Sequence, residues 1–416
     1  MVDIILLPFG SAGDVYPFIG LGKELVNRGY SVVALTSGYY REPLMRAGIE
    51  LVDVFSEEKY RALIGHPDTW EPGLKSLRKA IGAAEEVLPP QYEYLTLRKD
   101  DDVLIISGAF CFAARIAQEK HEMKNITMQT SPAYINSVQK PPLISGLYMP
   151  DWMPMWARRL QYSIVGRFAD KLFQGINDFR EKCNLEPVKK VGTHWANSPL
   201  MTVGLFPSWF CPPADDWDKF VHLADFPTYD DPKISYKSDV VDAFIKKTRP
   251  LGKPIIFCPG SAVMNDPSFF RSAVDACIQL NKPGILVTNF EDQIPSNLPV
   301  NVIHVRYIPF SKVLEQVETM VHHGGIGTVA SCFSSATSQV IIPSAYDQFD
   351  NGRRVEQLGV GRVLGKKQVS GNSLASTIKE VYEDSSFQKK CQQIQKKMLA
   401  YDEGLKTVCD LVLSKV

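Results

Sequence analysis

Short runs of apolar residues alternate along this chain with segments in which apolar positions recur at helical spacing. In the first half, the runs DIILLP, SVVALT, DVLIIS and NITMQT are separated by amphipathic stretches such as FIGLGKELVNRG and AFCFAARIAQEKH. The same rhythm resumes later with KPIIFCPG, KPGILVTN, VNVIHVRY, ETMVHH and QVIIPS. Buried strands that alternate with helices are typical of parallel sheets with helices on both faces, so the pattern predicts an α/β fold.

The alternation is interrupted between Phe206 and Pro250, where proline, aspartate and aromatic residues replace both periodicities. This interruption predicts domains at residues 1–232 and 251–395, an interdomain linker at 233–250 and a C-terminal helix at 396–416. Both domains open alike, since ILLPFGSAG and IIFCPGSAV each run from a strand into Gly-Ser-Ala. Two such Rossmann-like sheets are expected to face each other across a cleft and to bind ligands at the carboxyl ends of their strands.

Charge and composition narrow the functional classes. The 46 basic side chains balance 46 acidic ones, so the basic footprint of a nucleic-acid-binding protein is missing and a small ligand is expected. The eight cysteines are scattered, which indicates reduced thiols and a cytoplasmic location. VDIILLPFG lacks a basic leader, and no run approaches the ~18 apolar residues of a membrane span, so we expect neither export nor a spanning helix.

The stretch VHHGGIGTVAS, residues 321 to 331, predicts an anion-binding turn. Glycines at 324, 325 and 327 allow close approach of the backbone, and a helix that begins near Gly327 points its unpaired N–H groups and positive dipole end toward a ligand. His323 and the hydroxyl of Thr328 add side-chain donors. The expected ligand is a phosphate or a diphosphate.

One interpretation of this turn is dinucleotide binding by an NAD-dependent oxidoreductase, because Gly325, Gly327 and Ala330 satisfy G-x-G-x-x-A. That fingerprint normally follows the first strand of its domain, with an acid at the tip of the next strand. Here the match comes late in the second domain, and Asp347 lies beyond the end of QVIIP.

The other interpretation rests on a longer run, VHHGGIGTVASCFSSATSQVIIPSAYDQFDNGRR, which resembles the donor-binding signature of family 1 glycosyltransferases with the GT-B fold. The matching positions are His323, Gly324, Gly325, Gly327, Thr328, Pro343, Asp347, Gln348 and Asn351. PFGSAGDVYPFIGLGKELVNRGYSVV is similar to the family's first loop and helix, most closely to those of the rhamnolipid-type rhamnosyltransferase and the sterol and antibiotic glycosyltransferases. The resemblance implies two Rossmann-like domains facing across a cleft, with the C-terminal helix returning to the first.

The resemblance also implies the activity, which is inverting, metal-independent transfer of a hexose from a UDP- or dTDP-sugar to a hydroxyl of a small, apolar acceptor. The nucleotide sugar is a co-substrate, and no other cofactor is expected. Ser331 stands where many members carry a glutamate that binds the ribose hydroxyls, so a deoxyribose donor becomes plausible while a uridine donor stays open. A nucleotide-sugar-binding protein without turnover is the second alternative, and the sequence leaves the oligomeric state open.

Site residues follow from the same resemblance. The diphosphate is assigned to His323, Thr328 and the backbone from Gly325 to Gly327, and Tyr307 and Ile308 are assigned to the base. Asp347 and Gln348 are expected to hold sugar hydroxyls. The donor-binding set is completed by first-loop and second-domain residues, which are Gly10, Ser11, Gly13 and Ser261.

Asp14 is the candidate general base, because the sterol, antibiotic and rhamnolipid enzymes that the chain resembles carry an aspartate at this place in the first loop. Such a base contributes typically ~10²–10⁴-fold in rate. The alternative is that Asp14 only caps a helix that begins near Tyr16. No metal is expected, since the D-x-D at Asp100–Asp102 precedes a strand and reads as a solvated turn.

The acceptor is expected to contact Trp152 and Trp156, in the aromatic- and methionine-rich segment 141–168. Such a segment suits an apolar acceptor or a face for peripheral contact with a membrane. Plain core packing is the alternative. The resemblance to the rhamnolipid-type rhamnosyltransferase implies a hydroxylated fatty acid as the acceptor and dTDP-rhamnose as the donor.

Overall fold

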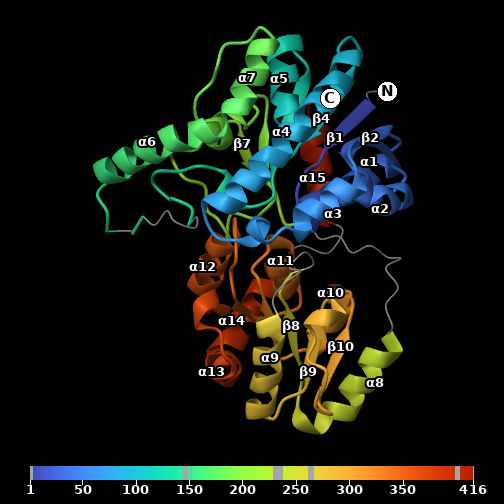
Figure 1. Cartoon of the computed structure of the whole chain (residues 1–416), viewed down its shortest axis with the longest axis vertical. Helices are drawn as coiled ribbons and strands as arrows, with labels where there is room; N and C mark the ends of the chain where they lie inside the picture. Colours follow the sequence, from blue (N-terminus) through green and yellow to red (C-terminus); the bar gives the residue numbers. More distant parts are fainter. Residues whose placement is uncertain are drawn as a thin grey trace. The chain divides into compact units, whose positions relative to one another are not determined.

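The computed structural model describes residues 3–143, 149–150, 152–227, 238–260, 267–398 and 403–415, and the chain divides into two compact units. The first unit comprises Met1–Tyr229 and Ala400–Val416, and the second comprises Asp230–Leu399. Each unit is built on a parallel sheet covered by helices (Figure 1). The α/β class and the pair of Rossmann-like sheets expected from the alternation are therefore confirmed.

The first unit contains a seven-stranded sheet in the order β3-β2-β1-β4-β5-β6-β7. The chain adds β2 and β3 on one side of β1 and then returns to add β4 on the other, so the strand order reverses between β1 and β4. The strands are β1 (Asp3–Leu7), β2 (Val32–Ser37), β3 (Glu50–Phe55), β4 (Val103–Ser107), β5 (Lys124–Gln129), β6 (Thr202–Gly204) and β7 (Val221–Leu223).

The helices of the first unit include one from the C-terminal end of the chain. Helix α15 packs on α1, where the thiol of Cys409 reaches the carbonyl oxygen of Leu21 and Arg28 forms an ion pair with Asp410. The return of the terminal helix to the first domain is thus observed. The helices are α1 (Ala12–Asn27), α2 (Arg41–Arg46), α3 (Glu57–Gly65), α4 (Leu74–Leu97), α5 (Phe112–His121), α6 (Met155–Leu172), α7 (Gln174–Lys182) and α15 (Glu403–Leu413).

The second unit contains a six-stranded sheet in the order β10-β9-β8-β11-β12-β13, which reverses between β8 and β11. Its strands are β8 (Ile255–Cys258), β9 (Gly284–Val287), β10 (Val302–Val305), β11 (Thr319–His322), β12 (Ser338–Ile341) and β13 (Gly361–Val363). Its helices are α8 (Ser238–Thr248), α9 (Pro267–Leu280), α10 (Phe310–Val313), α11 (Ile326–Ser334), α12 (Gln348–Leu358), α13 (Gly371–Glu383) and α14 (Ser385–Gln395).

Helix α8 occupies much of the segment 233–250, which we expected to be a linker. Its Val241 and Phe244 are buried in a core cluster of the second unit, because apolar residues spaced three apart fall on one face of a helix. Residues 228–237, which include the start of that segment, lie outside the described part of the chain. Within the described residues, no helix is both long and apolar enough to cross a bilayer.

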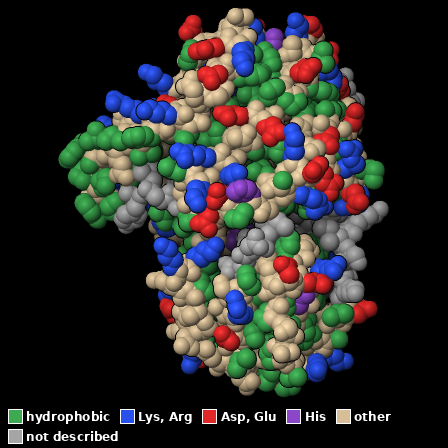
Figure 2. All heavy atoms as spheres, viewed as in Figure 1, with side chains coloured by type: hydrophobic (Ala, Val, Ile, Leu, Met, Phe, Trp, Pro, Cys, Tyr) green, Lys and Arg blue, Asp and Glu red, His purple; other side chains and the backbone are tan. Residues whose placement is uncertain are grey.

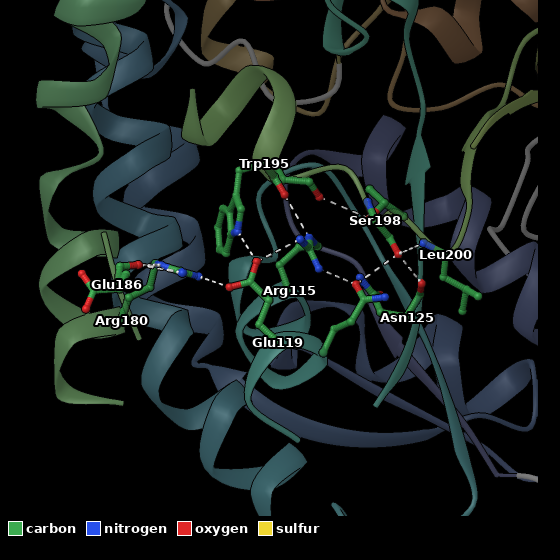
Figure 3. Close-up of polar contacts among 11 residues, drawn as sticks. Arg115, Glu119, Asn125, Arg180, Glu186, Trp195, Ser198 and Leu200 are labelled. Atoms are coloured by element: carbon green, nitrogen blue, oxygen red, sulfur yellow. Dashed lines mark hydrogen bonds and ion pairs between the residues drawn. The ribbon is translucent and has the colours of Figure 1, made fainter. Parts of the chain in front are cut away.

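A buried polar cluster joins three segments of the first unit (Figure 3). The carboxylate of Glu119 on α5 accepts hydrogen bonds from Arg115 Nη2 at 3.0 Å, Arg180 Nη1 at 2.6 Å and Trp195 Nε1 at 2.6 Å. The two guanidinium groups, with side chains 8% and 4% exposed, also lie over the Trp195 ring. Glu119 therefore neutralises cations that water cannot reach, and it ties α5 to α7 and to the turn at Trp195.

Replacing Glu119 by glutamine should lower the free energy of unfolding by roughly 3 kcal/mol, because removal of one partner leaves buried charge uncompensated. The measurement is chemical denaturation of the whole chain. The control is Glu57→Gln, which removes an exposed pair with Arg61 and should cost only about 0.5 kcal/mol. Equal losses in the two variants would contradict a structural role for the cluster.

Candidate functional site

Each sheet places one group of the sequence-predicted residues at the point where its strand order reverses. In the first unit, the loop after β1 leads into α1, whose first turn carries Asp14. In the second unit, the loop after β11 carries His323 and leads into α11. Open α/β sheets bind ligands at such reversal points, because the loops of neighbouring strands leave in opposite directions and open a crevice.

Asp14 lies in the first turn of α1, which begins at Ala12 rather than near Tyr16 as expected. Ser11 donates to Asp14 Oδ2 from both its backbone N–H and its hydroxyl, each at 2.9 Å, so the pair forms a capping box. Thr130, just after β5, donates to the other carboxylate oxygen at 3.3 Å. The capping role is therefore real, and it fixes the carboxylate in one orientation.

Burial raises the pKa of Asp14 above its ordinary value of 3.8, and the hydrogen bonds from Ser11 and Thr130 oppose that shift. A carboxylate with a raised pKa holds a proton more strongly than a surface aspartate does, which is the property that a general base needs. The surroundings of Asp14 thus suit proton transfer as well as capping.

Two tyrosines that the sequence motifs did not reveal form hydrogen bonds that hold the loop before Asp14. Tyr60 donates from its hydroxyl to the carbonyl oxygen of Gly10 at 3.1 Å, and the hydroxyl of Tyr40 lies 2.5 Å from that of Tyr60. Burial raises the pKa of both phenols, so both keep their protons. Because these tyrosines lie 30 and 50 residues from Gly10, local spacing carried no signal for the contact.

Gly10 is required at its position by its own backbone and by Asp14. Its φ is +133°, and an added Cβ would lie 2.5 Å from Asp14 Oδ2. The first-loop residues assigned to the donor thus differ in their contacts and exposure. Gly10 and Ser11 contact Asp14, whereas Gly13 is exposed in the first turn of α1.

The imidazole of His323 lies between two glycines. A Cβ on Gly260, after β8, would lie 3.1 Å from Nδ1, and one on Gly325 would lie 2.4 Å from Nε2. Nδ1 is buried without a hydrogen-bond partner among the described residues. Burial lowers the pKa of His323 from 6.5 to about 4, so at neutral pH the ring is uncharged and keeps one N–H. A buried polar nitrogen without a partner is a group that a ligand can satisfy.

His322, the other histidine of the pair, shapes the turn. It is fully buried, its Nδ1 accepts the N–H of Gly324 at 3.1 Å, and its Nε2 lies 3.0 Å from Gln339 Oε1. Because Nδ1 accepts, the proton must lie on Nε2 and be donated to Gln339. Burial, reinforced by the neighbouring His323, lowers the pKa of His322 to about 3. This positioning role was not foreseen, although the histidine doublet at the end of a strand was its signal.

Helix α11 directs its N-terminal end into the same turn. Gly325 is its N-cap residue, and the first intrahelical bond runs from the N–H of Val329 to the carbonyl oxygen of Gly325 at 3.0 Å. The N–H groups of residues 326–328 precede that bond and, like the first amides of any helix, have no intrahelical acceptor. A Cβ on Gly327 would meet nothing within 4 Å, and the side chain of Thr328 is partly exposed beside it. Unpaired amides and the helix dipole together favour an anion here.

The predicted sugar-binding pair opens α12, after β12. Asn351 Nδ2 donates to Asp347 Oδ2 at 2.7 Å and to the carbonyl oxygen of Gly324 at 2.9 Å, so it links Asp347 to the His323 turn. Gln348 Oε1 accepts the N–H groups of Ser344 and Ala345, at 2.8 and 3.1 Å. The side-chain oxygen of Gln348 thus shapes the loop, and the side-chain Nε2 of Gln348 is the group left to donate.

For the other predicted residues that are described, the structure gives the place in the fold and the exposure of the side chain. Tyr307 and Ile308 stand between β10 and α10, with Tyr307 partly exposed and Ile308 buried. Trp152, just before α6, is 82% exposed, and Trp156, in the first turn of α6, is 71% exposed. Ser261 lies outside the described residues.

The D-x-D at Asp100–Asp102 stands at the amino end of β4, away from the strand ends that carry the predicted site. Its Asp101 forms an ion pair with Arg98, and its Asp102 lies 3.7 Å from Lys124 Nζ. Among the described residues, no group of three or more histidine, cysteine, aspartate or glutamate side chains is arranged to hold a metal ion.

Family models match the two ends of the chain. The glycosyltransferase family 28 N-terminal domain matches residues 4–139, and the C-terminal domain of erythromycin biosynthesis protein CIII-like proteins matches residues 274–412. These matches cover the Asp14 loop and the His323 turn, respectively.

Curated relatives and solved structures agree with the family models. The sterol 3-beta-glucosyltransferase of Vanderwaltozyma polyspora is 25% identical over 434 residues, which cover 99% of this chain and 34% of the relative. The sterol 3-beta-glucosyltransferase of Yarrowia lipolytica is 27% identical over an alignment that covers 89% of this chain and 26% of the relative. The chain therefore spans about a third or less of the length of these relatives.

The similar solved structures share the fold at low identity. The glycosyltransferase of kitacinnamycin has a TM-score of 0.76 at 20% identity and covers 100% of this chain and 99% of that one. The spinosyn rhamnosyltransferase SpnG, complexed with thymidine diphosphate, has a TM-score of 0.68 at 15% identity, with 98% and 100% covered. The family models, the relatives and the fold together support the resemblance of this chain to the family 1 glycosyltransferases with the GT-B fold.

Proposed function

We propose that the chain transfers a hexose from a dTDP- or UDP-sugar to a hydroxyl group of an apolar acceptor, with inversion and without a metal ion. The observation that carries the proposal is the His323 turn, where a buried imidazole nitrogen lacks a partner beside the amino end of α11. The names of the similar proteins support it, since the relatives are sterol glucosyltransferases and one solved neighbour holds thymidine diphosphate.

In this proposal the second unit binds the donor. The amides of residues 326–328, the hydroxyl of Thr328 and the N–H of His323 bind the diphosphate, which gains charge as it leaves. Tyr307 and Ile308 contact the base, and Asp347 and Gln348 contact the sugar. Ser331, in place of a carboxylate for the ribose hydroxyls, favours a thymidine donor.

Asp14 acts as the general base in this proposal. The acceptor oxygen attacks the anomeric carbon while its proton passes to the Asp14 carboxylate. The bond from the anomeric carbon to the diphosphate breaks, and its electron pair leaves with the diphosphate. The capping bonds from Ser11 keep the carboxylate in place throughout, and the proton is later released to solvent.

Two other functions would give different results in direct assays. A protein that binds nucleotide sugars without turnover would be stabilised by them in thermal shift measurements but would yield no glycoside. An NAD-dependent oxidoreductase would be stabilised by NAD instead. Mass spectrometry of products formed from dTDP- and UDP-sugars with sterols, hydroxylated fatty acids and phenols separates all three.

Asp14→Asn should lower the transfer rate by ~10²–10⁴-fold, because the amide cannot accept the acceptor proton. Affinity for the donor should stay within about twofold, since the amide oxygen can still accept the capping bonds. Steady-state kinetics with separate calorimetric donor titration measures both effects. Full activity in this variant would contradict the role of Asp14 as base.

Donor affinity should increase as the pH is lowered from 7 to 5, because a diphosphate stabilises the imidazolium and so raises the pKa of His323 from about 4 toward 6.5. Calorimetry with dTDP-glucose tests this, as its diphosphate does not titrate in that range. His323→Ala should bind about tenfold more weakly and lose the pH dependence. His222→Ala, at an exposed position on β7, is the control. An unchanged pH dependence in His323→Ala would contradict the assignment.

Tyr60→Phe should lower kcat roughly five- to tenfold with little change in the KM for the donor, because one hydrogen bond that positions the Asp14 loop is lost. The pH at which kcat falls on the acid side should shift as well, because the substitution changes the surroundings of the Asp14 carboxylate. Tyr39→Phe alters a neighbouring tyrosine whose ring centroid lies 4.7 Å from that of Tyr60, and it serves as the control. Equal losses in both variants, together with lowered thermal midpoints, would reduce Tyr60 to a packing residue.

A further inference from the structure

Large apolar side chains are exposed to solvent along helix α6 and just before it. Trp152, Trp156, Leu160, Ile164 and Phe168 are 82%, 71%, 55%, 49% and 66% exposed, respectively. Trp152 lies just before the helix, and the other four follow one another along it at intervals of four residues, slightly more than one turn, so they form a continuous band. We call these five residues the α6 stripe. Figure 2 shows apolar side chains gathered over α6, with lysine and arginine side chains along their margin.

The α6 stripe differs from the exposed apolar residues of the rest of the molecule. Thirteen large apolar side chains are exposed in the described part of the chain, and six of them lie between residues 152 and 168. The other seven are scattered along the chain, each at least six positions from the next. Single exposed apolar residues are normal, whereas a contiguous group marks an interaction surface.

The opposite side of α6 is anchored, so the stripe cannot turn inward. The guanidinium of Arg158 is buried and donates to the carbonyl oxygens of Met153 at 3.0 Å, Gln139 at 2.9 Å and Pro150 at 3.1 Å. One turn further along, the hydroxyl of Tyr162 donates to the carbonyl oxygen of Ser137 at 2.8 Å. These bonds fix the rotation of the helix with the α6 stripe outward.

The charges beside the α6 stripe are almost all positive. Arg159, Arg167 and Lys171 are exposed on the helix, whose one acid is Asp170. The Asp170 carboxylate accepts the backbone N–H of Lys190 at 2.6 Å, which brings the exposed Lys189–Lys190 pair to the same end of α6. The whole chain has no net charge, so this local excess is not a consequence of its composition.

We propose that α6 docks on the surface of a bilayer that contains anionic lipids. Tryptophan and phenylalanine side chains enter the zone between headgroups and acyl chains, and the basic residues contact lipid phosphates. Protein interfaces are depleted in lysine, and three of the five exposed basic residues beside the apolar band are lysines, so the band fits lipid better than a protein partner. A small-molecule site is concave and buries most of its ligand, unlike the exposed face of α6.

Docking of this kind would give the enzyme access to apolar acceptors dissolved in the bilayer. That consequence rests on the proposed transferase function, but docking itself does not. A binding assay with vesicles therefore tests the surface alone, and its outcome is independent of whether any sugar is transferred.

The test is flotation of the full chain with vesicles of phosphatidylcholine alone and of phosphatidylcholine mixed with phosphatidylglycerol. The natural sequence should bind the mixed vesicles at least about tenfold more strongly than the neutral ones. Trp156→Ser combined with Phe168→Ser should weaken that binding by at least about tenfold, because binding scales with the apolar area inserted. Arg159→Glu combined with Arg167→Glu should remove the preference for anionic lipid.

The control variant, Ile278→Ser combined with Val300→Ser, removes two exposed apolar residues elsewhere and should bind as the natural sequence does. All altered side chains are exposed, so thermal midpoints should stay unchanged in every variant. Absence of binding to the mixed vesicles, or equal binding by the Trp156 and Phe168 double variant, would overturn the proposal. Self-association in sedimentation velocity that only this double variant abolishes, without vesicle binding, would assign the α6 stripe to a second copy of the chain.

Discussion

The parallel pairing of β8 with β11, and of β1 with β4, is the constraint on which the candidate site depends. His322 lies opposite Cys258 in the register, so the chain leaves both strands at the same level and brings Gly260 against the ring of His323. In the first unit, Leu7 lies opposite Ser107 in the same way. A shift of one residue in either pairing would turn the loop residues to the wrong face of the sheet.

Burial controls the charge of the groups at these strand ends. It raises the pKa of the Asp14 carboxyl and lowers the pKa of both histidines, which in each case favours the neutral form. For His322 the neutral form is structural, since only a neutral ring can accept the N–H of Gly324 through Nδ1. For His323, the neutral form leaves an uncharged ring next to the amino end of α11. A bound anion would therefore meet the helix dipole and a neutral N–H donor in that turn, not a cation.

Aromatic residues serve two unlike purposes in the first unit. Tyr40 and Tyr60 are buried, their hydroxyl groups contact each other, and that of Tyr60 donates to the carbonyl oxygen of Gly10 in the loop before Asp14. Trp152 and Trp156 are 82% and 71% exposed. Burial thus distinguishes the tyrosines that hydrogen-bond near Gly10 from the tryptophans of the proposed docking surface.

The sequence by itself determined the α/β class, the first strand of each sheet and the glycine-rich turns that follow β1 and β11, because strand and helix periodicity and glycine-rich turns are local patterns. It did not determine that Tyr60 supports Gly10, that Arg158 holds α6 with its stripe outward, or that α8 belongs to the second unit. These facts depend on contacts between segments that are distant in the chain. Such contacts were decided by strand order and helix rotation, which hydrophobic spacing does not encode, since the same spacing is compatible with several arrangements of the same elements.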